Sequence, residues 1–312
     1  MKKFGIKQSA LWLTLAAVLA TTLVACDGAG QAADDALVTL TDDLGNTVQI
    51  TAQVERIISL APSNTEIAFA LGLGDRLVGV SDWSDYPPEA LEVQKVGTGT
   101  EANLELIVSL DPDLVLSIGG EPVPAINAQL RDLGITVLVL VADDLEGIYH
   151  DIELVGQAAG VEDEAEDLTD DMRARVSAVT EAVAAAGDQP LVFYELDATD
   201  PTRPWTVGAG SWHDDFITLV GGTNLAGDLA NSWVQINAEE IVARDPDIIV
   251  LGDANWGITP ESVAGRPGWD VIAAVQEGRV YGIDDNLISR QGPRVVDGIE
   301  ALAKLIHPEL FD

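Results

Sequence analysis

The sequence is poor in the residues that most often carry chemistry. Its 312 residues include one cysteine, so no disulfide can form within the chain. The three histidines have no ligand-like spacing, and a zinc or manganese site built from several histidines is therefore not expected. The chain has no GxSxG nucleophile elbow and no Gly-rich phosphate loop. Ser211, His213 and Asp214 are too close together on one segment to form a catalytic triad by spacing alone. A secreted glycosidase that uses two of the many carboxylates is the enzyme alternative that stays open.

Basic residues are also scarce. Lys and Arg number 16 against 52 Asp and Glu, which gives a formal net charge of −36. Such a surface repels phosphate backbones, so the composition excludes nucleic acids as partners. Most of this acidity is explained by solubility, for example in a saline habitat. Attraction to a basic partner would need specific acidic residues at the contact.

The first residues have the pattern of a secretory signal. Lys2, Lys3 and Lys7 precede an apolar run over residues 10–20, which is too short for a comfortable membrane span. The run ends in Leu-Val-Ala-Cys, residues 23–26, which resembles the lipobox of bacterial lipoproteins. We therefore predict a signal peptide over 1–25, lipid on Cys26 and a flexible tether over 26–36, although an ordinary signal with an incidental cysteine is the alternative. The mature protein would work outside the cell membrane, anchored to it.

One stretch occurs twice, and it predicts two similar lobes. Residues 103–116 read NLELIVSLDPDLVL, and residues 237–250 read NAEEIVARDPDIIV. Each copy has a capping Asn, a short helix, an Asp-Pro-Asp break and an apolar strand. The copies are too far apart for solenoid repeats, so they indicate equivalent corners of two lobes.

The predicted N-terminal lobe covers 37–142. Alternating residues around Gly45 and Asn46 predict a β-hairpin over 37–50. Residues 57–60, a helix from Pro62 to Gly72, and residues 77–80 then form a βαβ unit, whose ligand-contacting loops lie at the carboxyl ends of its strands. Trp83 and Tyr86 follow the second strand, and Trp83 is as well explained by packing as by ligand contact.

The rest of the mature chain divides into a helical segment, 143–187, and a C-terminal lobe, 188–312. A Pro-free helix of about 24 residues ending near Gly187 would span about 36 Å, enough to run from one lobe to the other. In the C-terminal lobe we predict strands over 191–194 and 248–251 and long loops over 195–212 and 227–236. These loops and the segment after the second strand carry most of the tryptophans, which suits a wide, flat, partly apolar ligand; they are Trp205, Trp212, Trp233, Trp256 and Trp269.

Residues from Arg56 to the C-terminus resemble the cobalamin and iron-siderophore class of substrate-binding proteins of ABC importers, and the cobalamin-binding member above all. The similarity rests on Asn-Thr-Glu at 64–66, Ser-Asp-Tyr-Pro-Pro at 84–88 and the repeated corner. It implies an α/β protein with two Rossmann-like lobes, mostly parallel central sheets, one long backbone helix that limits closure, and a ligand cleft between the lobes. It also implies a monomer without enzyme activity or resident cofactor, which delivers a corrinoid, ferric siderophore or haem to a membrane permease.

The resemblance also assigns residues. Trp205 and Trp233 match pocket aromatics, whereas Gly99 departs from the cobalamin binder, which has a tryptophan there. Glu105 and Glu239 match the glutamates that form salt bridges to the two permease subunits, although a carboxylate at a helix start also stabilises the helix dipole. Independently of the resemblance, the scarce basic residues Arg203, Arg290 and, least favoured, Arg294 are candidates to meet an anionic group, with simple ion pairing as the alternative. Asn286 is a further polar candidate, because it lies with Arg290 on a predicted ligand-edge loop.

Overall fold

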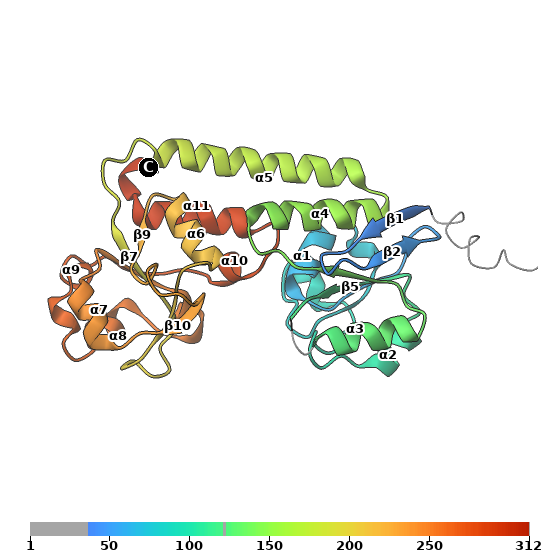
Figure 1. Ribbon diagram of the computed structural model, residues 1–312, viewed down its shortest axis with the longest axis horizontal. Coiled ribbons are helices and arrows are strands. Elements are labelled where there is room, and N and C mark those ends of the chain that lie inside the picture. Colours follow the sequence, from blue (N-terminus) through green and yellow to red (C-terminus); the bar gives the residue numbers. More distant parts are fainter. Residues whose placement is uncertain (1–36, 121–122, 312) are drawn as a thin grey trace, which may run out of the picture.

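The computed structural model describes residues 37–120 and 123–311, which form two α/β lobes joined by the long helix α5 (Figure 1). The predicted fold class is confirmed. The predicted signal peptide, Cys26 and the tether lie outside the described residues. Within the described part of the chain, no helix combines the length and the apolar character needed to cross a membrane.

The N-terminal lobe begins with the predicted hairpin. Strands β1 (Val38–Thr41) and β2 (Thr47–Ile50) pair antiparallel, and Gly45 takes a positive φ of 78° in the turn between them. Asp42 holds this turn, because its carboxylate accepts hydrogen bonds from the backbone N–H groups of Leu44 and Asn46. The hairpin packs against α4 through its buried side chains.

A four-stranded parallel sheet forms the core of the N-terminal lobe, in the order β4-β3-β5-β6. Since all four strands run in the same direction, their carboxyl ends lie at one edge. The strands are β3 (Ile57–Ser59), β4 (Leu77–Val80), β5 (Leu114–Ile118) and β6 (Val137–Leu140). The helices are α1 (Pro62–Ala70), η1 (Gly74–Arg76), η2 (Pro88–Leu91), α2 (Leu104–Ser109), α3 (Val123–Asp132) and α4 (Leu145–Ala159).

The C-terminal lobe has a mostly parallel sheet in the order β10-β8-β7-β11-β12, with β9 also pairing with β7. Strands β7, β9, β11 and β12 are parallel, whereas β8 and β10 are antiparallel additions at one edge. The strands are β7 (Leu191–Asp197), β8 (Trp205–Val207), β9 (Thr223–Asn224), β10 (Trp233–Gln235), β11 (Ile248–Leu251) and β12 (Val280–Gly282). The helices are α6 (Trp212–Leu219), α7 (Ala238–Arg244), η3 (Gly252–Trp256), α8 (Pro260–Ala264), η4 (Trp269–Val271), α9 (Ala273–Gln276), α10 (Asn286–Ser289), α11 (Val295–Ile306) and η5 (Pro308–Leu310).

Three predictions for this lobe were wrong. The segments 195–212 and 227–236 are not continuous loops, because each contributes a three-residue strand, β8 and β10. The two strands pair with each other, and Thr206 also donates from its hydroxyl to the carbonyl of Tyr194. Trp269 is not a loop aromatic: it is 1% exposed and packs edge-on against Phe193.

Helix α5 (Glu162–Val183) joins the two lobes, as predicted. Its 22 residues span about 33 Å and pack on α4 of the N-terminal lobe and on α11 of the C-terminal lobe (Figure 1). Arg175 fixes the second contact, because its guanidinium pairs with Asp297 and Glu300 of α11. One face of α5 is buried at helical spacing through Ala165, Thr169, Met172, Val176, Val179 and Val183.

The repeated stretch occupies the same corner in both lobes. Asn103 caps α2 and Asn237 caps α7, each accepting from the backbone N–H three residues on. Asp111 and Asp245 both take a positive φ, 47° and 50°, just beyond these helices. The strands that follow, β5 and β11, are central in their sheets. The prediction of equivalent corners is confirmed.

Candidate ligand cleft

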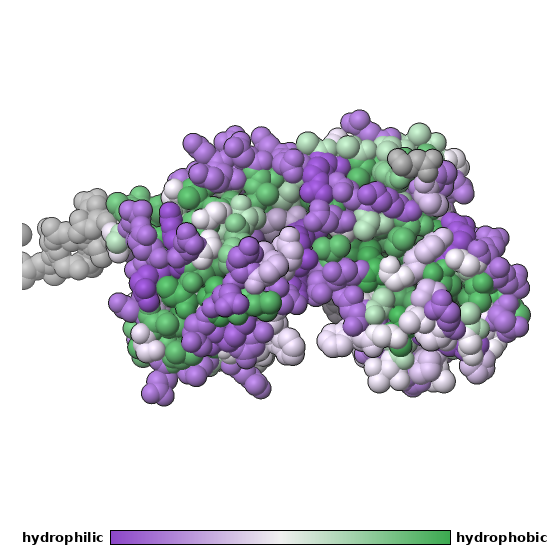
Figure 2. Space-filling model, turned by 180° about the vertical axis from the view of Figure 1, so that it is seen from behind, coloured by the Kyte–Doolittle hydropathy of each residue, from purple (hydrophilic) through white to green (hydrophobic). Residues whose placement is uncertain are grey.

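A hollow separates the two lobes on the side away from α5 (Figure 2). Loops from the carboxyl ends of the parallel strands of both lobes meet at its base. Arg290, which follows β12 and α10, contacts Asp85, which follows β4 of the other lobe. Ligands of open α/β sheets bind at such carboxyl ends, and this hollow is therefore the candidate ligand cleft.

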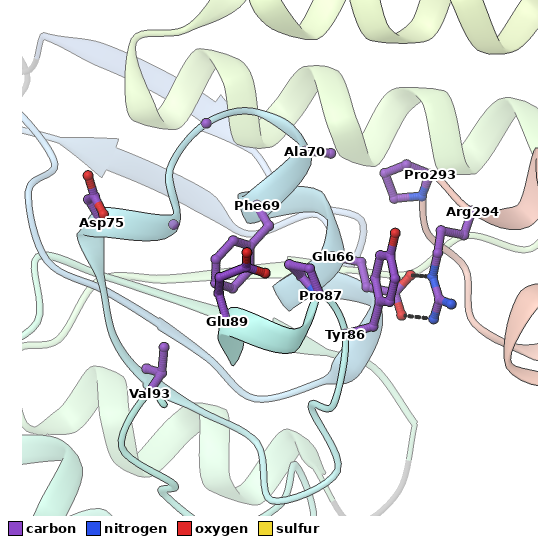
Figure 3. A pocket seen from close by; sticks show the side chains of 12 residues that line it. Glu66, Phe69, Ala70, Asp75, Tyr86, Pro87, Glu89, Val93, Pro293 and Arg294 are labelled. Carbon is purple, nitrogen blue, oxygen red and sulfur yellow. Dashed lines mark hydrogen bonds and ion pairs between the residues drawn. The ribbon is translucent and has the colours of Figure 1, made fainter. Parts of the chain in front are cut away.

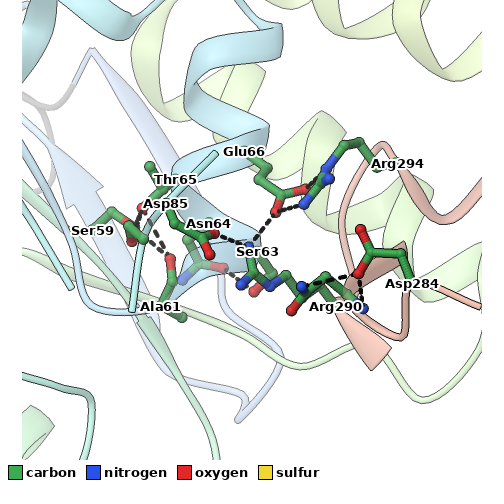
Figure 4. Close-up of polar contacts among 12 residues, drawn as sticks. Ser59, Ala61, Ser63, Asn64, Thr65, Glu66, Asp85, Asp284, Arg290 and Arg294 are labelled. Carbon is green, nitrogen blue, oxygen red and sulfur yellow. Dashed lines mark hydrogen bonds and ion pairs between the residues drawn. The ribbon is translucent and has the colours of Figure 1, made fainter. Parts of the chain in front are cut away.

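Ion pairs connect the lobes at the base of the cleft, and we call Glu66, Asp85, Arg290 and Arg294 the interlobe bridge (Figure 4). Arg290 Nη1 lies 3.1 Å from Glu66 Oε1 and 2.6 Å from Asp85 Oδ1. Arg294 donates to both carboxylate oxygens of Glu66 and lies over the ring of Tyr86, with Cζ 3.8 Å from the ring centroid. The Glu66 side chain is 2% exposed, so its charge is compensated almost entirely by these two guanidinium groups.

The interlobe bridge perturbs the titration of its own members. Burial alone would lower the pKa of Arg290, but hydrogen bonds to Asp85 and Glu66 raise it overall. The hydrogen bond from Arg290 lowers the pKa of Asp85. Both arginines therefore stay charged, and their charge is already matched by carboxylates from the other lobe.

The Asn-Thr-Glu string owes its position to the start of α1. Pro62 occupies the first turn of the helix, where no backbone donor is needed. Asn64 donates from its amide to the carbonyl of Ser117, at the carboxyl end of β5. Thr65 Oγ1 lies 2.7 Å from Ser84 Oγ, which ties this string to the loop that carries Trp83 and Tyr86. All three residues of the string are buried, so each has a structural role.

Four tryptophans that the sequence singled out are exposed at strand ends or on edge strands. Trp83 is 66% exposed after β4, and Trp256 is 85% exposed in η3 after β11. Trp205 and Trp233 are 40% and 38% exposed. Because Trp205 pairs with Gln235 and Trp233 with Val207, the two indoles lie on the same face of the β8–β10 ladder. This ladder is on the side of the C-terminal lobe that faces the N-terminal lobe (Figure 1).

The polar candidates differ in how their side chains are engaged. Arg203 is exposed in the turn before β8, and its guanidinium has no ion-pair partner within residues 37–120 and 123–311. Asn286 donates from its amide to Asp284, and Arg290 belongs to the interlobe bridge. Among these candidates, the structure thus leaves Arg203 available to a ligand. It pairs Arg290 with Glu66 and Asp85, and Arg294 with Glu66, which are partners that sequence reasoning did not identify.

A pocket of about 730 Å³ adjoins the interlobe bridge on the flank of the N-terminal lobe (Figure 3). Tyr86 and Arg294 form its wall nearest the C-terminal lobe, and Phe69 and Val93 contribute apolar surface. Elsewhere, Ser211 caps α6 by accepting from the backbone N–H of Asp214, which is a structural role. Among the described residues, no group of three or more His, Cys, Asp or Glu side chains is arranged to hold a metal ion.

Glu105 and Glu239 occupy equivalent positions in the two lobes. Each is exposed and is the second residue of its helix, α2 or α7. These helices lie toward opposite ends of the molecule, on the side away from α5 (Figure 1).

The fold, the cleft and the strand-end aromatics define a bilobal solute-binding protein. The chain belongs to the periplasmic binding protein family, whose model matches residues 57–287. It is 36% identical over 321 residues to the ABC transporter substrate-binding lipoprotein YvrC of Bacillus subtilis, covering 98% of this chain and 99% of that protein.

Two further relatives differ in the ligand that their names record. The vitamin B12-binding protein of Vibrio cholerae is 32% identical over 250 residues, covering 79% of this chain and 87% of that protein. A crystal structure of the periplasmic vitamin B12 binding protein BtuF of that organism has a TM-score of 0.69 at 31% identity, covering 83% of this chain and 99% of that chain. The structure of the periplasmic heme-binding protein RhuT from Roseiflexus has a TM-score of 0.72 at 28% identity, covering 82% of this chain and 98% of that chain.

Proposed function

We propose that this protein is the solute receptor of an ABC importer, which captures a corrinoid in the interlobe cleft and delivers it to a membrane permease. The observation that carries the proposal is the pair of exposed indoles, Trp205 and Trp233, on one face of the ladder that faces the other lobe. Two flat aromatic surfaces on one face suit a wide, flat ligand. The Vibrio cholerae relative supports a corrinoid in particular, and Trp83 and Trp256 would complete the aromatic lining.

The charge of the loops around the cleft favours a corrinoid as the ligand. A haem or a ferric siderophore is the second choice. The loops after β4, β7 and β12 carry the exposed acids Asp82, Asp200 and Asp284. Arg290 is already paired with two carboxylates, which leaves Arg203 to meet an anionic group. A ligand with several negative charges would face net repulsion here, whereas the neutral amides of a corrinoid would not.

The remaining predictions follow from this function. Cys26 would carry the lipid that anchors the protein outside the membrane, with residues 1–25 removed and 26–36 as the tether. Glu105 and Glu239 would each contact one subunit of the permease dimer, since one exposed acid on the same corner of each lobe suits a two-fold symmetric partner. The domains would be 37–142, 143–187 and 188–312. The protein would perform no bond chemistry.

Titration of the purified protein with cyanocobalamin, haem and a panel of ferric siderophores tests the ligand. Tryptophan fluorescence reports binding, and calorimetry checks it because coloured ligands absorb the emission. One-to-one binding of cyanocobalamin that exceeds the binding of the other ligands would support the proposal. Saturable binding of haem or a siderophore alone would identify that compound, and not a corrinoid, as the ligand. No binding of any of these compounds would overturn the proposed function.

A further inference from the structure

The buried histidine His213 links the Trp233 indole to α10, the helix next to Arg290. His213 is 1% exposed at the start of α6. Its ring centroid lies 5.3 Å from that of Trp233, 5.3 Å from that of Trp212 and 5.0 Å from that of Tyr194. These four rings form a cluster, and neither the proposed ligand contacts nor the interlobe bridge explains why they pack together.

The orientation of Trp233 depends on these ring contacts. Strand β10 has three residues, is at the edge of the sheet and pairs with β8, so its backbone restrains the indole weakly. Trp212 and His213 both pack against the Trp233 indole at steep interplanar angles, 74° and 81°. Trp212 is itself fixed, because its Nε1–H donates to the carbonyl of Ile288 in α10.

On its other side, His213 contacts a buried polar network. Its Nε2 lies 3.3 Å from Ser289 Oγ and 3.7 Å from Asp285 Oδ1. Asp285 also accepts hydrogen bonds from Ser289 Oγ, at 2.5 Å, and from Tyr194 Oη, at 2.6 Å. Burial would raise the pKa of Asp285, but the nearby His213 ring and the hydrogen bonds from Ser289 and Tyr194 lower it overall.

The donor pattern fixes the tautomer of His213. The Ser289 hydroxyl donates its proton to Asp285, so its oxygen is left to accept from His213 Nε2–H. His213 Nδ1 is buried and has no hydrogen-bond partner within the described residues. A nitrogen without a proton there is less costly than a buried N–H without an acceptor, so a ring that carries its proton on Nε2, toward Ser289, fits the site.

We propose that His213 is a positioning residue: its Nε2–H contact with Ser289 sets the ring angle at which His213 supports the Trp233 indole. The inference rests on the proposed function, since it concerns the same ligand surface. Because Ser289 directly precedes Arg290, this contact also connects the Trp233 surface to the interlobe bridge. Ligand affinity therefore depends on a side chain that is buried behind the ligand surface.

The first test uses the ligand-free protein. Two indoles with ring centroids 5.0 Å apart give an exciton couplet in circular dichroism, and Trp233→Phe, which abolishes the couplet, identifies the signal of the Trp212–Trp233 pair. His213→Phe keeps an aromatic ring but loses the Nε2–H donor, and Ser289→Ala removes the acceptor without changing any ring. We expect both variants to lower the couplet amplitude about equally and the double variant to lower it no further, since one contact is lost in each case.

The matched control is His307→Phe, which replaces another buried histidine of the same lobe. It should leave the couplet unchanged. A purely structural role for His213 would lower the unfolding temperature of His213→Phe while leaving the couplet of the folded protein intact. That result, or additive effects of His213→Phe and Ser289→Ala, would overturn the proposal.

The second test is calorimetry with cyanocobalamin. We expect His213→Phe and Ser289→Ala each to weaken binding by about tenfold, whereas His307→Phe stays at the wild-type affinity. Wild-type affinity in both variants would overturn the inference. If the wild-type protein does not bind cyanocobalamin, the proposed function fails, while the couplet still decides whether His213 positions Trp233.

Discussion

Arg294 and Glu66 form a two-point ion pair between the lobes, with Nε 2.8 Å from Oε2 and Nη2 2.7 Å from Oε1, although they are 228 positions apart in the chain. The pair lies where α11 begins and α1 approaches the C-terminal lobe. The lobes are therefore held together at two places, along α5 and at the interlobe bridge. Such a double connection limits how far the cleft can open or close.

Glu66→Gln should destabilise the protein by about 3 to 5 kcal/mol, because it removes the charge of a buried carboxylate and leaves the partly buried Arg294 without a charged partner and Arg290 with one instead of two. Urea unfolding measures this loss. Asp75→Asn is the control, since it removes the same charge from an exposed position nearby. Equal stability of the two variants would mean that the interlobe bridge contributes nothing to the free energy of unfolding.

Asp111 and Asp245, which both have a positive φ, should respond differently to substitution by glycine. Asp111→Gly relieves the unfavourable φ and removes no side-chain hydrogen bond within the described structure. It should therefore stabilise the protein, by at most about 1 kcal/mol. Asp245→Gly relieves the same φ, but it removes the acceptor of the Ala273 N–H bond, at 2.7 Å, and should destabilise by about 1 to 2 kcal/mol. Chemical denaturation of both variants tests the difference, and a reversed order would contradict it.

Asp151→Asn should stabilise the protein at neutral and alkaline pH. Burial raises the pKa of Asp151 to about 9, with a further contribution from neighbouring Asp43. Because the pKa is raised in the folded state, the stability contribution of Asp151 is complete below about pH 4 and is lost as the pH rises to about 9. Asparagine stays neutral, so we expect a gain of about 2 to 4 kcal/mol at pH 7 and none at pH 4.

Unfolding curves from pH 4 to 9 measure this gain. Asp167→Asn is the control, because this exposed aspartate on α5 carries the same charge. A gain that is constant across the pH range would show that charge burial is not its cause.

Charge reversal at Glu105 or Glu239, the proposed contacts with the permease, should impair delivery of the ligand but not its capture. Glu105→Lys and Glu239→Lys should each lower ligand uptake through the permease by about tenfold or more, because each places like charges across the contact. Uptake of labelled ligand by cells measures delivery, and calorimetry of the same variants should give unchanged ligand affinity. Glu181→Lys, on the opposite side of the molecule in α5, should behave as wild type. Normal uptake by the Glu105 and Glu239 variants would contradict the proposal that these residues contact the permease.

Local signals in the sequence predicted most of the fold. The hairpin turn at Gly45, the capping Asn103 and Asn237, and the helix breaks at Pro112 and Pro246 each act within a few residues of their own position, so their effect is readable without the fold. The Pro-free run that ends near Gly187 likewise predicts α5 as one long helix, whereas its buried face is known from the structure.

The parts that sequence reasoning missed depend on distant partners. β8 and β10 have three residues each and no periodicity of their own, and they are strands because they pair with each other beside β7. Trp269 looked like a loop aromatic because its partner Phe193 is distant in sequence. The partners of Arg290 could not be chosen from 52 acids without the arrangement of the two lobes.

Calorimetry with cyanocobalamin, on wild-type protein and on Trp205→Ala/Trp233→Ala, is the decisive test of corrinoid capture by the two indoles. We expect one-to-one binding by the wild type and a loss of affinity of about 100-fold in the double variant, since buried aromatic contacts dominate binding energy. Leu133→Ala, which changes an exposed apolar residue at the end of α3, should retain full affinity. Undiminished binding by a folded double variant would place the ligand elsewhere and contradict capture by Trp205 and Trp233.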